Sequence, residues 1–387
     1  MSVPLPDRDT IILHPPSRDE IVQVCGAWVT ALGGPDAVTD LQRLVLTAIT
    51  KSMTGHDIDL LRGPVVDPVG LGKVLANRDA AFRSRIIQAL LTAEMLLRPI
   101  PLEVTARVEA YARELGVEDD MFNVVRRLAD GAFGLALVDF QRSGYEGAFD
   151  HDIQGTGLHT SKKLHTAWAE DPDDPVLAAQ WAALERCAPG SLGRGLFEFY
   201  AARGFSYPGT PDSAPPLLAQ HDWVHVLTGY GSTVESEIEV FTFIARANDD
   251  PRAFSLQAMV LSLFETGYLS AGAGLFLYDT GHLSDRAESM AVRMGDAMRR
   301  GALCACHGDL LSADWFSYAD RSLEDVRRDL NIIPKSEAAW LAGSVTAWEH
   351  GGISPYQYEH GQAAAAAAGR RYDSYGATPA EAQSPPR

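Results

Sequence analysis

The chain has 387 residues, of which 46% are hydrophobic and 22% are charged. This length suits two or three compact domains, and the composition excludes a disulfide-stapled mini-protein or a disordered regulator. Lys and Arg total 33 against 51 Asp and Glu, which gives a formal net charge of -18. Such a surface repels a phosphate backbone, so we expect no nucleic-acid partner.

The number of cysteines and the first residues of the chain indicate the cellular compartment. Four cysteines are too few and too scattered for a disulfide framework or a Cys-rich zinc site. The first twenty residues contain no long apolar segment behind a basic start, which predicts that no secretory signal is present. We therefore expect reduced thiols and a cytoplasmic protein, with contact at the inner face of the cell membrane also open.

Helical spacing of apolar residues, closed by turn residues, recurs between about residues 20 and 148. The clearest runs cover residues 36–50, 79–97, 101–117 and 118–131. Pro101 stands just inside one run and Gly116 just past its end, the usual asymmetry of helix boundaries. We predict an all-helical N-terminal domain over residues 1–150. The sequence assigns no role to this domain.

The rest of the chain divides into three parts. Residues 151–174 are polar and Gly-rich, which predicts a linker. Residues 175–335 carry further helical signals and are predicted to form a second helical domain, a bundle. Residues 336–387 form a C-terminal extension, whose six alanines from Ala363 and Pro-rich end are low in complexity and predict a mobile tail. The predicted fold class is all-α with two helical domains.

The segment 215–241 holds the residues that carry chemistry. On a helix starting near Pro215, His221, Asp222 and His225 fall within one arc of about 100 degrees, and the other faces are apolar. The helix should therefore be buried. Three ionisable groups on an interior arc must be neutralised by hydrogen bonds, by each other or by a cation.

A second helix should return beside the first. Gly229 and Gly231 break the first helix, and Ser232 with Glu235 has the spacing of a capping box that starts another. Of the acids on that second helix, Glu237 lies at the edge of the apolar stripe, so it should point toward the histidines. Two imidazoles with one or two carboxylates suit zinc or ferrous iron.

The full spacing is more specific than its parts. The chain has three His-Asp dipeptides where its composition predicts about one, so the dipeptide alone says little. Only His221-Asp222 adds a second His one turn on and a Glu on the returning helix. The complete pattern HDxxHx11E has an expectation on the order of one in a thousand for this composition. The competing interpretation is a pair of hydrogen-bonded core histidines.

This pattern resembles the signature of the coenzyme Q biosynthesis protein four family. The likeness extends to residues 188–209 and 314–332, and it covers roughly residues 175–332. It implies an all-helical domain with a metal at the positions matching His221, Asp222, His225 and Glu237. It also implies a polyprenylated aromatic ligand, peripheral membrane contact, other quinone-biosynthesis proteins as partners, and oxidative removal of a ring carboxylate. A homodimer is compatible with the sequence.

If the metal binds, His221, His225 and Glu237 would form a facial set, while Asp222 either ligates the metal or orients an imidazole. The cation could polarise the phenolate and carboxylate of the substrate as carbon dioxide leaves. The apolar stretch 253–278 would line a tunnel for the prenyl tail, in which each buried methylene contributes about 0.8 kcal/mol. The other interpretation of that stretch is two buried helices around a bend.

Two alternatives from other classes remain open. The first is a prenyl-lipid-binding scaffold with a structural metal and no turnover, for which four protein ligands would close a zinc site. The second is an HD-type metal phosphohydrolase, which needs a further His and Asp in the same pocket. His159, His165 and Asp309 are its candidates, although their spacing matches no known pattern.

Overall fold

The computed structural model describes most of the chain in several separate ranges. These are residues 16–119, 121–129, 174–210, 213, 216–248, 257, 260–261, 264–265, 281–306, 310–311 and 313–380. The fold is mostly helical, which confirms the predicted class at that level. The described part also contains one two-stranded sheet, which the sequence did not predict.

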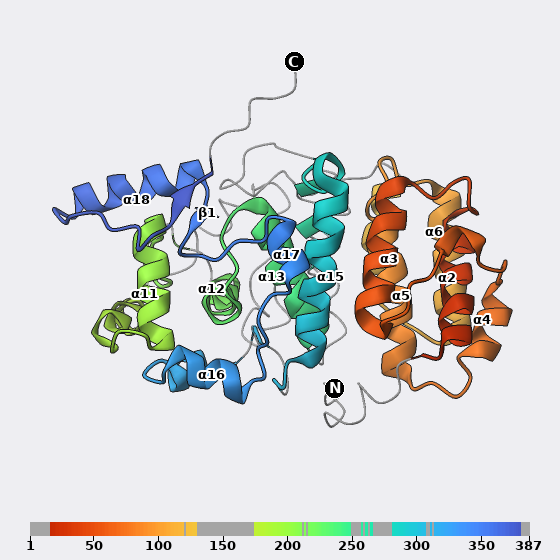
Figure 1. Cartoon of the computed structure of the whole chain (residues 1–387), viewed down its shortest axis with the longest axis horizontal. Coiled ribbons are helices and arrows are strands. Elements are labelled where there is room, and N and C mark those ends of the chain that lie inside the picture. Colours follow the sequence, from red (N-terminus) through yellow and green to blue (C-terminus); the bar gives the residue numbers. More distant parts are fainter. Residues whose placement is uncertain are drawn as a thin grey trace, which may run out of the picture.

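The N-terminal part is a bundle of helices, drawn in red to orange in Figure 1. It comprises α2 (Arg18–Leu32), α3 (Asp40–Thr54), η1 (Leu60–Arg62), α4 (Pro68–Val74), α5 (Ala80–Glu94), α6 (Leu102–Leu115) and α7 (Met121–Ala129). Side-chain caps such as Ser17 and Asp79 start these helices, and left-handed glycines such as Gly116 end several of them. The four predicted runs of this region are confirmed as helices.

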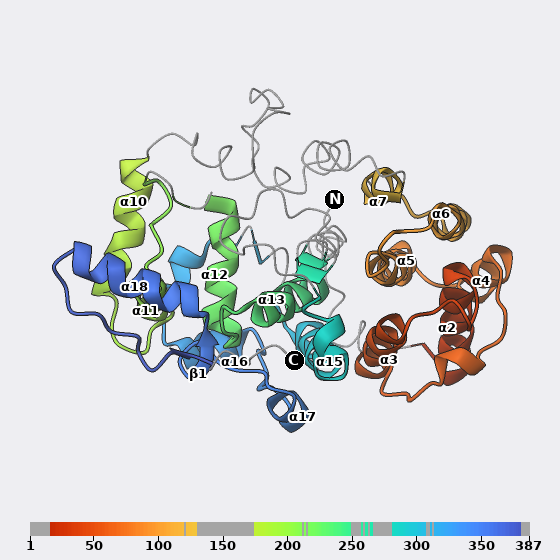
Figure 2. The same cartoon turned by 90° about the horizontal axis from the view of Figure 1, so that it is seen from above.

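The middle of the chain forms the second group of helices. It comprises α10 (Pro175–Ala182), η3 (Ala183–Arg186), α11 (Leu192–Arg203), α12 (Pro216–Thr228), α13 (Val234–Ala247), η5 (Ser284–Arg286), α15 (Ala287–Leu303), η6 (Trp315–Tyr318) and α16 (Leu323–Asp329). Helix α12 packs between α11 and α13, and α13 packs along α15. The predicted metal ligands therefore lie on two neighbouring helices, α12 and α13, and α11 packs on α12 from the other side (Figure 2).

The described part of the C-terminal extension, residues 336–380, is folded and corrects one prediction. It contains α17 (Glu337–Leu341), β1 (His350–Ile353), α18 (Pro355–Ala367) and β2 (Thr378–Pro379), and β1 pairs with β2 in parallel. The prediction that the alanine run is mobile is wrong, because these residues form most of the second half of α18. Ser354 caps this helix, Pro355 stands at its first position, and the helix packs on α11. The Pro-rich residues after 380 lie outside the described ranges.

The two helical groups meet along a seam between α3 and α15, which lie side by side in both views (Figures 1 and 2). The backbones approach closely at Gly295, where an added Cβ would lie 3.2 Å from the Cβ of Ala48. One hydrophobic core continues across both groups. The division into domains 1–150 and 175–335 stays a prediction, and all of the predicted linker except Asp174 lies outside the described residues.

The apolar stretch 253–278 also lies mostly outside the described residues. The described members, Gln257, Val260, Leu261, Phe264 and Glu265, are all buried. The predicted prenyl tunnel is therefore untested. Among the described residues, every helix is too short or too polar to cross a lipid bilayer.

Candidate metal centre

Helices α12 and α13 form the predicted hairpin, although the cap differs from the prediction. Helix α12 ends at Gly229, whose φ of 71° is left-handed. Helix α13 is capped by Thr233, whose hydroxyl accepts from the backbone N–H of Ser236, so the predicted Ser232–Glu235 capping box is wrong. The hydroxyl of Ser232 is engaged elsewhere, since it accepts from Arg203 and donates to Gln357.

The turn between the helices rests on the C-terminal extension. The backbone N–H of Gly231 donates to the carbonyl of Val345, and that of Ser232 donates to the carbonyl of Gly352. A Cβ on Gly231 would lie 2.9 Å from the Gly352 oxygen, so glycine permits this close approach. The extension thereby fixes the angle at which α13 returns beside α12.

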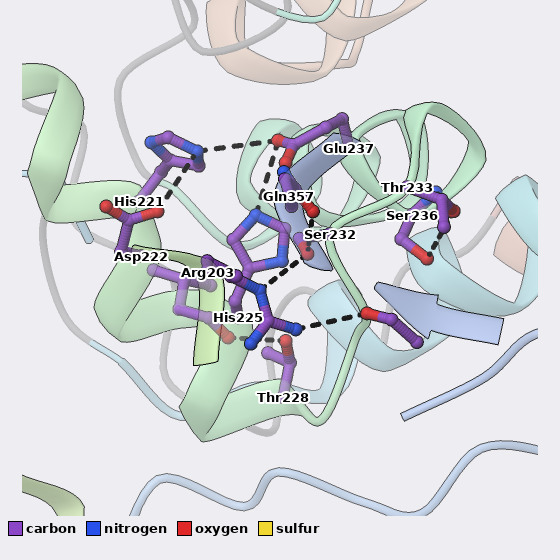
Figure 3. A network of polar contacts seen from close by, with 12 residues as sticks. Arg203, His221, Asp222, His225, Thr228, Ser232, Thr233, Ser236, Glu237 and Gln357 are labelled. Atoms are coloured by element: carbon purple, nitrogen blue, oxygen red, sulfur yellow. Dashed lines mark hydrogen bonds and ion pairs between the residues drawn. The ribbon is translucent and has the colours of Figure 1, made fainter. Parts of the chain in front are cut away.

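His221, His225 and Glu237 converge as predicted (Figure 3). The Oε2 atom of Glu237 lies 3.4 Å from Nε2 of His221 and 3.3 Å from Nε2 of His225. One ligand atom from each residue lies within 4.8 Å of the other two. Two neutral imidazole nitrogens and a carboxylate oxygen at this separation form a donor set that zinc and ferrous iron accept.

Asp222 borders this group but faces two ways. Its Oδ1 lies 3.6 Å from Nε2 of His221, while its Oδ2 accepts a 2.7 Å hydrogen bond from the hydroxyl of Tyr200. The cluster of potential ligands therefore contains three of the four predicted residues, and Asp222 lies at its edge. The structure leaves both predicted roles of Asp222 open, as a ligand or as a residue that orients His221.

Aromatic rings enclose the imidazoles. The ring of Phe199 stacks on His225 with centroids 5.4 Å apart, and Phe241 lies 5.2 Å from His221. His225 is fully buried, whereas 13% of the His221 side chain is exposed. Among the described residues, the cluster is therefore partly open on the side of His221 and Glu237, whose side chain is 10% exposed. The Nδ1 atom of His225 is buried with no partner among the described residues.

The two carboxylates differ in their electrostatics. Burial alone would raise the pKa of Glu237, but the charges and hydrogen bonds of His225 and His221 hold it well below its usual range. Burial raises the pKa of Asp222, opposed in part by the two histidines and by Tyr200. Burial, and then the nearby charge of Asp222, raise the pKa of Tyr200 well above its usual value, so this phenol stays a donor.

Arg203 of α11 supplies a fixed positive charge beside the cluster. Its guanidinium is fully buried and lies 3.7 Å from the centroid of the Phe199 ring. Burial lowers its pKa to about 9, although Asp222 and Glu237 act in the opposite direction. The guanidinium donates to Ser232 and to the carbonyls of Ala347 and Gly352, so it joins α11, the hairpin turn and the extension.

The remaining acids of α13 point elsewhere, as the helical angles predict. Glu239 pairs with Arg293 at 2.6 Å, and Glu235 pairs with Arg286 and His282. The dipeptide at His56 lies just after α3, where Asp57 faces Lys51 on the surface.

Sequence reasoning missed Tyr200, Arg203 and the extension as parts of this centre. Tyr200 and Arg203 lie in the segment 188–209 that contributed to the family resemblance, which was the only signal for them. The phosphohydrolase candidates His159, His165 and Asp309 lie outside the described residues.

Comparisons of the chain with models of protein families, with curated proteins and with solved structures find no match. The resemblance to the coenzyme Q biosynthesis protein four family accordingly stays a prediction.

Proposed function

We propose that this protein binds a divalent metal ion, zinc or ferrous iron, through His221, His225 and Glu237. The observation that carries the proposal is the approach of three ligand atoms to within 4.8 Å of one another from two adjacent helices. Glu237 supports it further, because its carboxylate is held ionised. A metal requires a deprotonated carboxylate and neutral imidazoles, so a bound ion would take the place of the imidazole charges that lower the pKa of Glu237.

We further propose that the metal serves prenylated-quinone biosynthesis. The support is the spacing HDxxHx11E together with its resemblance to the coenzyme Q biosynthesis protein four family. A polyprenylated hydroxybenzoate is the proposed ligand, and the proposed reaction is oxidative loss of its ring carboxylate as carbon dioxide, with an external oxidant such as dioxygen accepting the electrons. The bound ion would supply a Lewis acid for the substrate's phenolate and carboxylate. The proposed localisation is the cytoplasm or the inner face of the cell membrane.

The surroundings of the cluster give the protein's own residues two tasks in such a reaction. Phe199 and Phe241 shield the imidazoles from water on the buried sides, which strengthens electrostatic interactions within the centre. The partly exposed edges of His221 and Glu237 leave a direction of approach for an aromatic acid. Other proteins of the same biosynthetic route are the proposed partners.

The non-catalytic scaffold is a second candidate, and one distance favours it. Oδ1 of Asp222 lies 3.6 Å from Nε2 of His221, at the edge of the cluster, and a shift toward His225 and Glu237 would make it a fourth protein ligand. Four protein ligands would close a zinc site, whereas three would leave a position for substrate. Metal-loaded protein that binds the prenylated hydroxybenzoate and yields no product, with an oxidant supplied, would identify a scaffold. Turnover would identify an enzyme.

Metal analysis tests the proposal directly. We expect about one equivalent of metal in the native protein, and loss of most of it in His225→Ala and Glu237→Gln. Glu235→Gln is the matched control, because Glu235 is a buried acid of the same helical turn that pairs with Arg286 instead. Equal metal content in all four proteins, or a native protein that binds neither Zn²⁺ nor Fe²⁺ on titration, would overturn the assignment.

A further inference from the structure

Tyr200 contacts the metal centre through one hydrogen bond. It lies near the end of α11, is 2% exposed, and donates its hydroxyl to Oδ2 of Asp222 at 2.7 Å. Both groups are buried, so water does not compete for this bond. A hydrogen bond from a phenol to a carboxylate is charge-assisted when the acid is ionised, which makes it stronger than a neutral one.

The ring of Tyr200 is held on several sides by other aromatic rings. Its centroid lies 5.3 Å from that of Trp181, 5.5 Å from Phe205 and 5.8 Å from Tyr207. A ring packed in this way has little rotamer freedom, so the position of its hydroxyl is set by the packing of α11. Asp222 therefore receives its hydrogen bond from a nearly rigid donor.

The bond fixes the plane of the Asp222 carboxylate, so that one of its two equivalent oxygens faces the cluster. With Oδ2 engaged by Tyr200, the other oxygen, Oδ1, is the one that lies 3.6 Å from Nε2 of His221. Turning the plane of the carboxylate out of this orientation would break the bond to Tyr200 and leave a buried phenol without an acceptor, which costs about 1–3 kcal/mol, whereas a half-turn only exchanges the two equivalent oxygens. The carboxylate is thus held in one orientation.

We infer that Tyr200 is a positioning residue of the metal centre, which presents a single oxygen of Asp222 to the ion or to His221. The inference rests on the proposed function, since it needs an ion bound beside His221. It extends the centre from the hairpin α12–α13 to α11, an element that carries none of the predicted ligands. Groups that hold a ligand in place change metal affinity about 10- to 100-fold when they are removed.

Tyr200→Phe tests the inference, because it deletes only the hydroxyl and keeps the packed ring. The matched control is Tyr230→Phe, another buried tyrosine, whose hydroxyl has no partner among the described residues. The Zn²⁺ dissociation constant is measured by competition with a chromophoric chelator, and Co²⁺ substituted for Zn²⁺ reports the coordination geometry through its visible spectrum. Circular dichroism of the metal-free proteins verifies that each variant folds.

We expect Tyr200→Phe to weaken Zn²⁺ binding about 10- to 100-fold and to alter the Co²⁺ spectrum. Tyr230→Phe should change neither. Asp222→Asn should also weaken binding, and adding Tyr200→Phe to it should cause little further loss, because the hydroxyl acts through Asp222.

The outcomes separate the two proposals. Native protein that binds no metal overturns the proposed function. Native protein that binds metal while Tyr200→Phe binds it equally well, with an unchanged spectrum, overturns only the role of Tyr200. Equal weakening by Tyr200→Phe in the native and Asp222→Asn backgrounds would also overturn it, because the hydroxyl would then act independently of Asp222.

Discussion

Replacement of Arg203 by Met should loosen the C-terminal extension from the metal centre. The change keeps an unbranched, apolar side chain of similar length but removes the guanidinium. Three acceptors outside α11 then lose a hydrogen bond, namely the hydroxyl of Ser232 and the carbonyls of Ala347 and Gly352, although Gly352 still accepts from the backbone N–H of Ser232. Within α11, the carbonyl of Phe199 loses one as well. The stacking of the guanidinium on Phe199 is lost as well.

The magnitude follows from burial. Each hydrogen bond to a charged group contributes about 1.5–3 kcal/mol net, so three bonds set an upper figure of several kcal/mol. Burying the guanidinium is itself costly, as its pKa of about 9 indicates, and that cost disappears in the variant. Removing one side of a buried charged network usually destabilises a protein by about 3–5 kcal/mol, which is our expectation for Arg203→Met.

Urea unfolding followed by circular dichroism measures this change. Limited proteolysis should detect earlier cleavage between residues 344 and 379 in the variant. Arg328→Met is the control, since 71% of that side chain is exposed and its ion pair is with Asp325 on the same helix; its effect should stay within about 0.5 kcal/mol. If Arg203→Met unfolded at the native midpoint, the reasoning that the guanidinium joins the extension to the hairpin would be refuted.

Two further predictions concern stability. Glu94 is fully buried, and burial raises its pKa from 4.5 to about 8 although Thr105 donates to it. The folded state then holds a proton that the unfolded state releases above pH 4.5, so this contribution to stability falls as the pH rises toward 8. Glu94→Gln should therefore be about 3 kcal/mol more stable than the native protein at pH 7 and equally stable near pH 4. Urea unfolding at both pH values measures the two free energies of unfolding, and the same pH dependence in both proteins would contradict this prediction. Gly231→Ala places a Cβ 2.9 Å from the carbonyl oxygen of Gly352 and should destabilise by about 1–3 kcal/mol while lowering metal content, whereas an unchanged midpoint would show that the turn can yield.

Local patterns account for what the sequence could predict. The helices of the N-terminal part follow from apolar spacing and caps, both properties of neighbouring residues. The orientation of Glu237 follows in the same way, because the angle around α13 separates it from Glu235 and Glu239. Two adjacent helices joined by a short turn must lie side by side, so three ligands could be placed without any tertiary information.

The rest of the centre depends on contacts between residues far apart in the chain. Tyr200 reaches Asp222 from a different helix, and nothing in the spacing of either residue encodes that contact. Ser232 has the spacing of a helix cap, but Arg203 and Gln357 engage its hydroxyl and Thr233 caps the helix instead. The alanine-rich helix α18 was missed because composition alone cannot show that α11 offers a surface to pack against.

The distance along the chain between Arg203 and its acceptor Gly352 bears on how the protein is made. The two residues are 149 positions apart, yet their hydrogen bond fixes the turn that aligns the imidazoles with Glu237. On the ribosome, the three proposed metal ligands emerge long before β1, which holds the turn between their helices. Closing so long a loop is slow, and it must precede the stabilisation that the contact provides. If the proposed ion binds, the nascent chain should therefore acquire it only after β1 has left the exit tunnel of the ribosome.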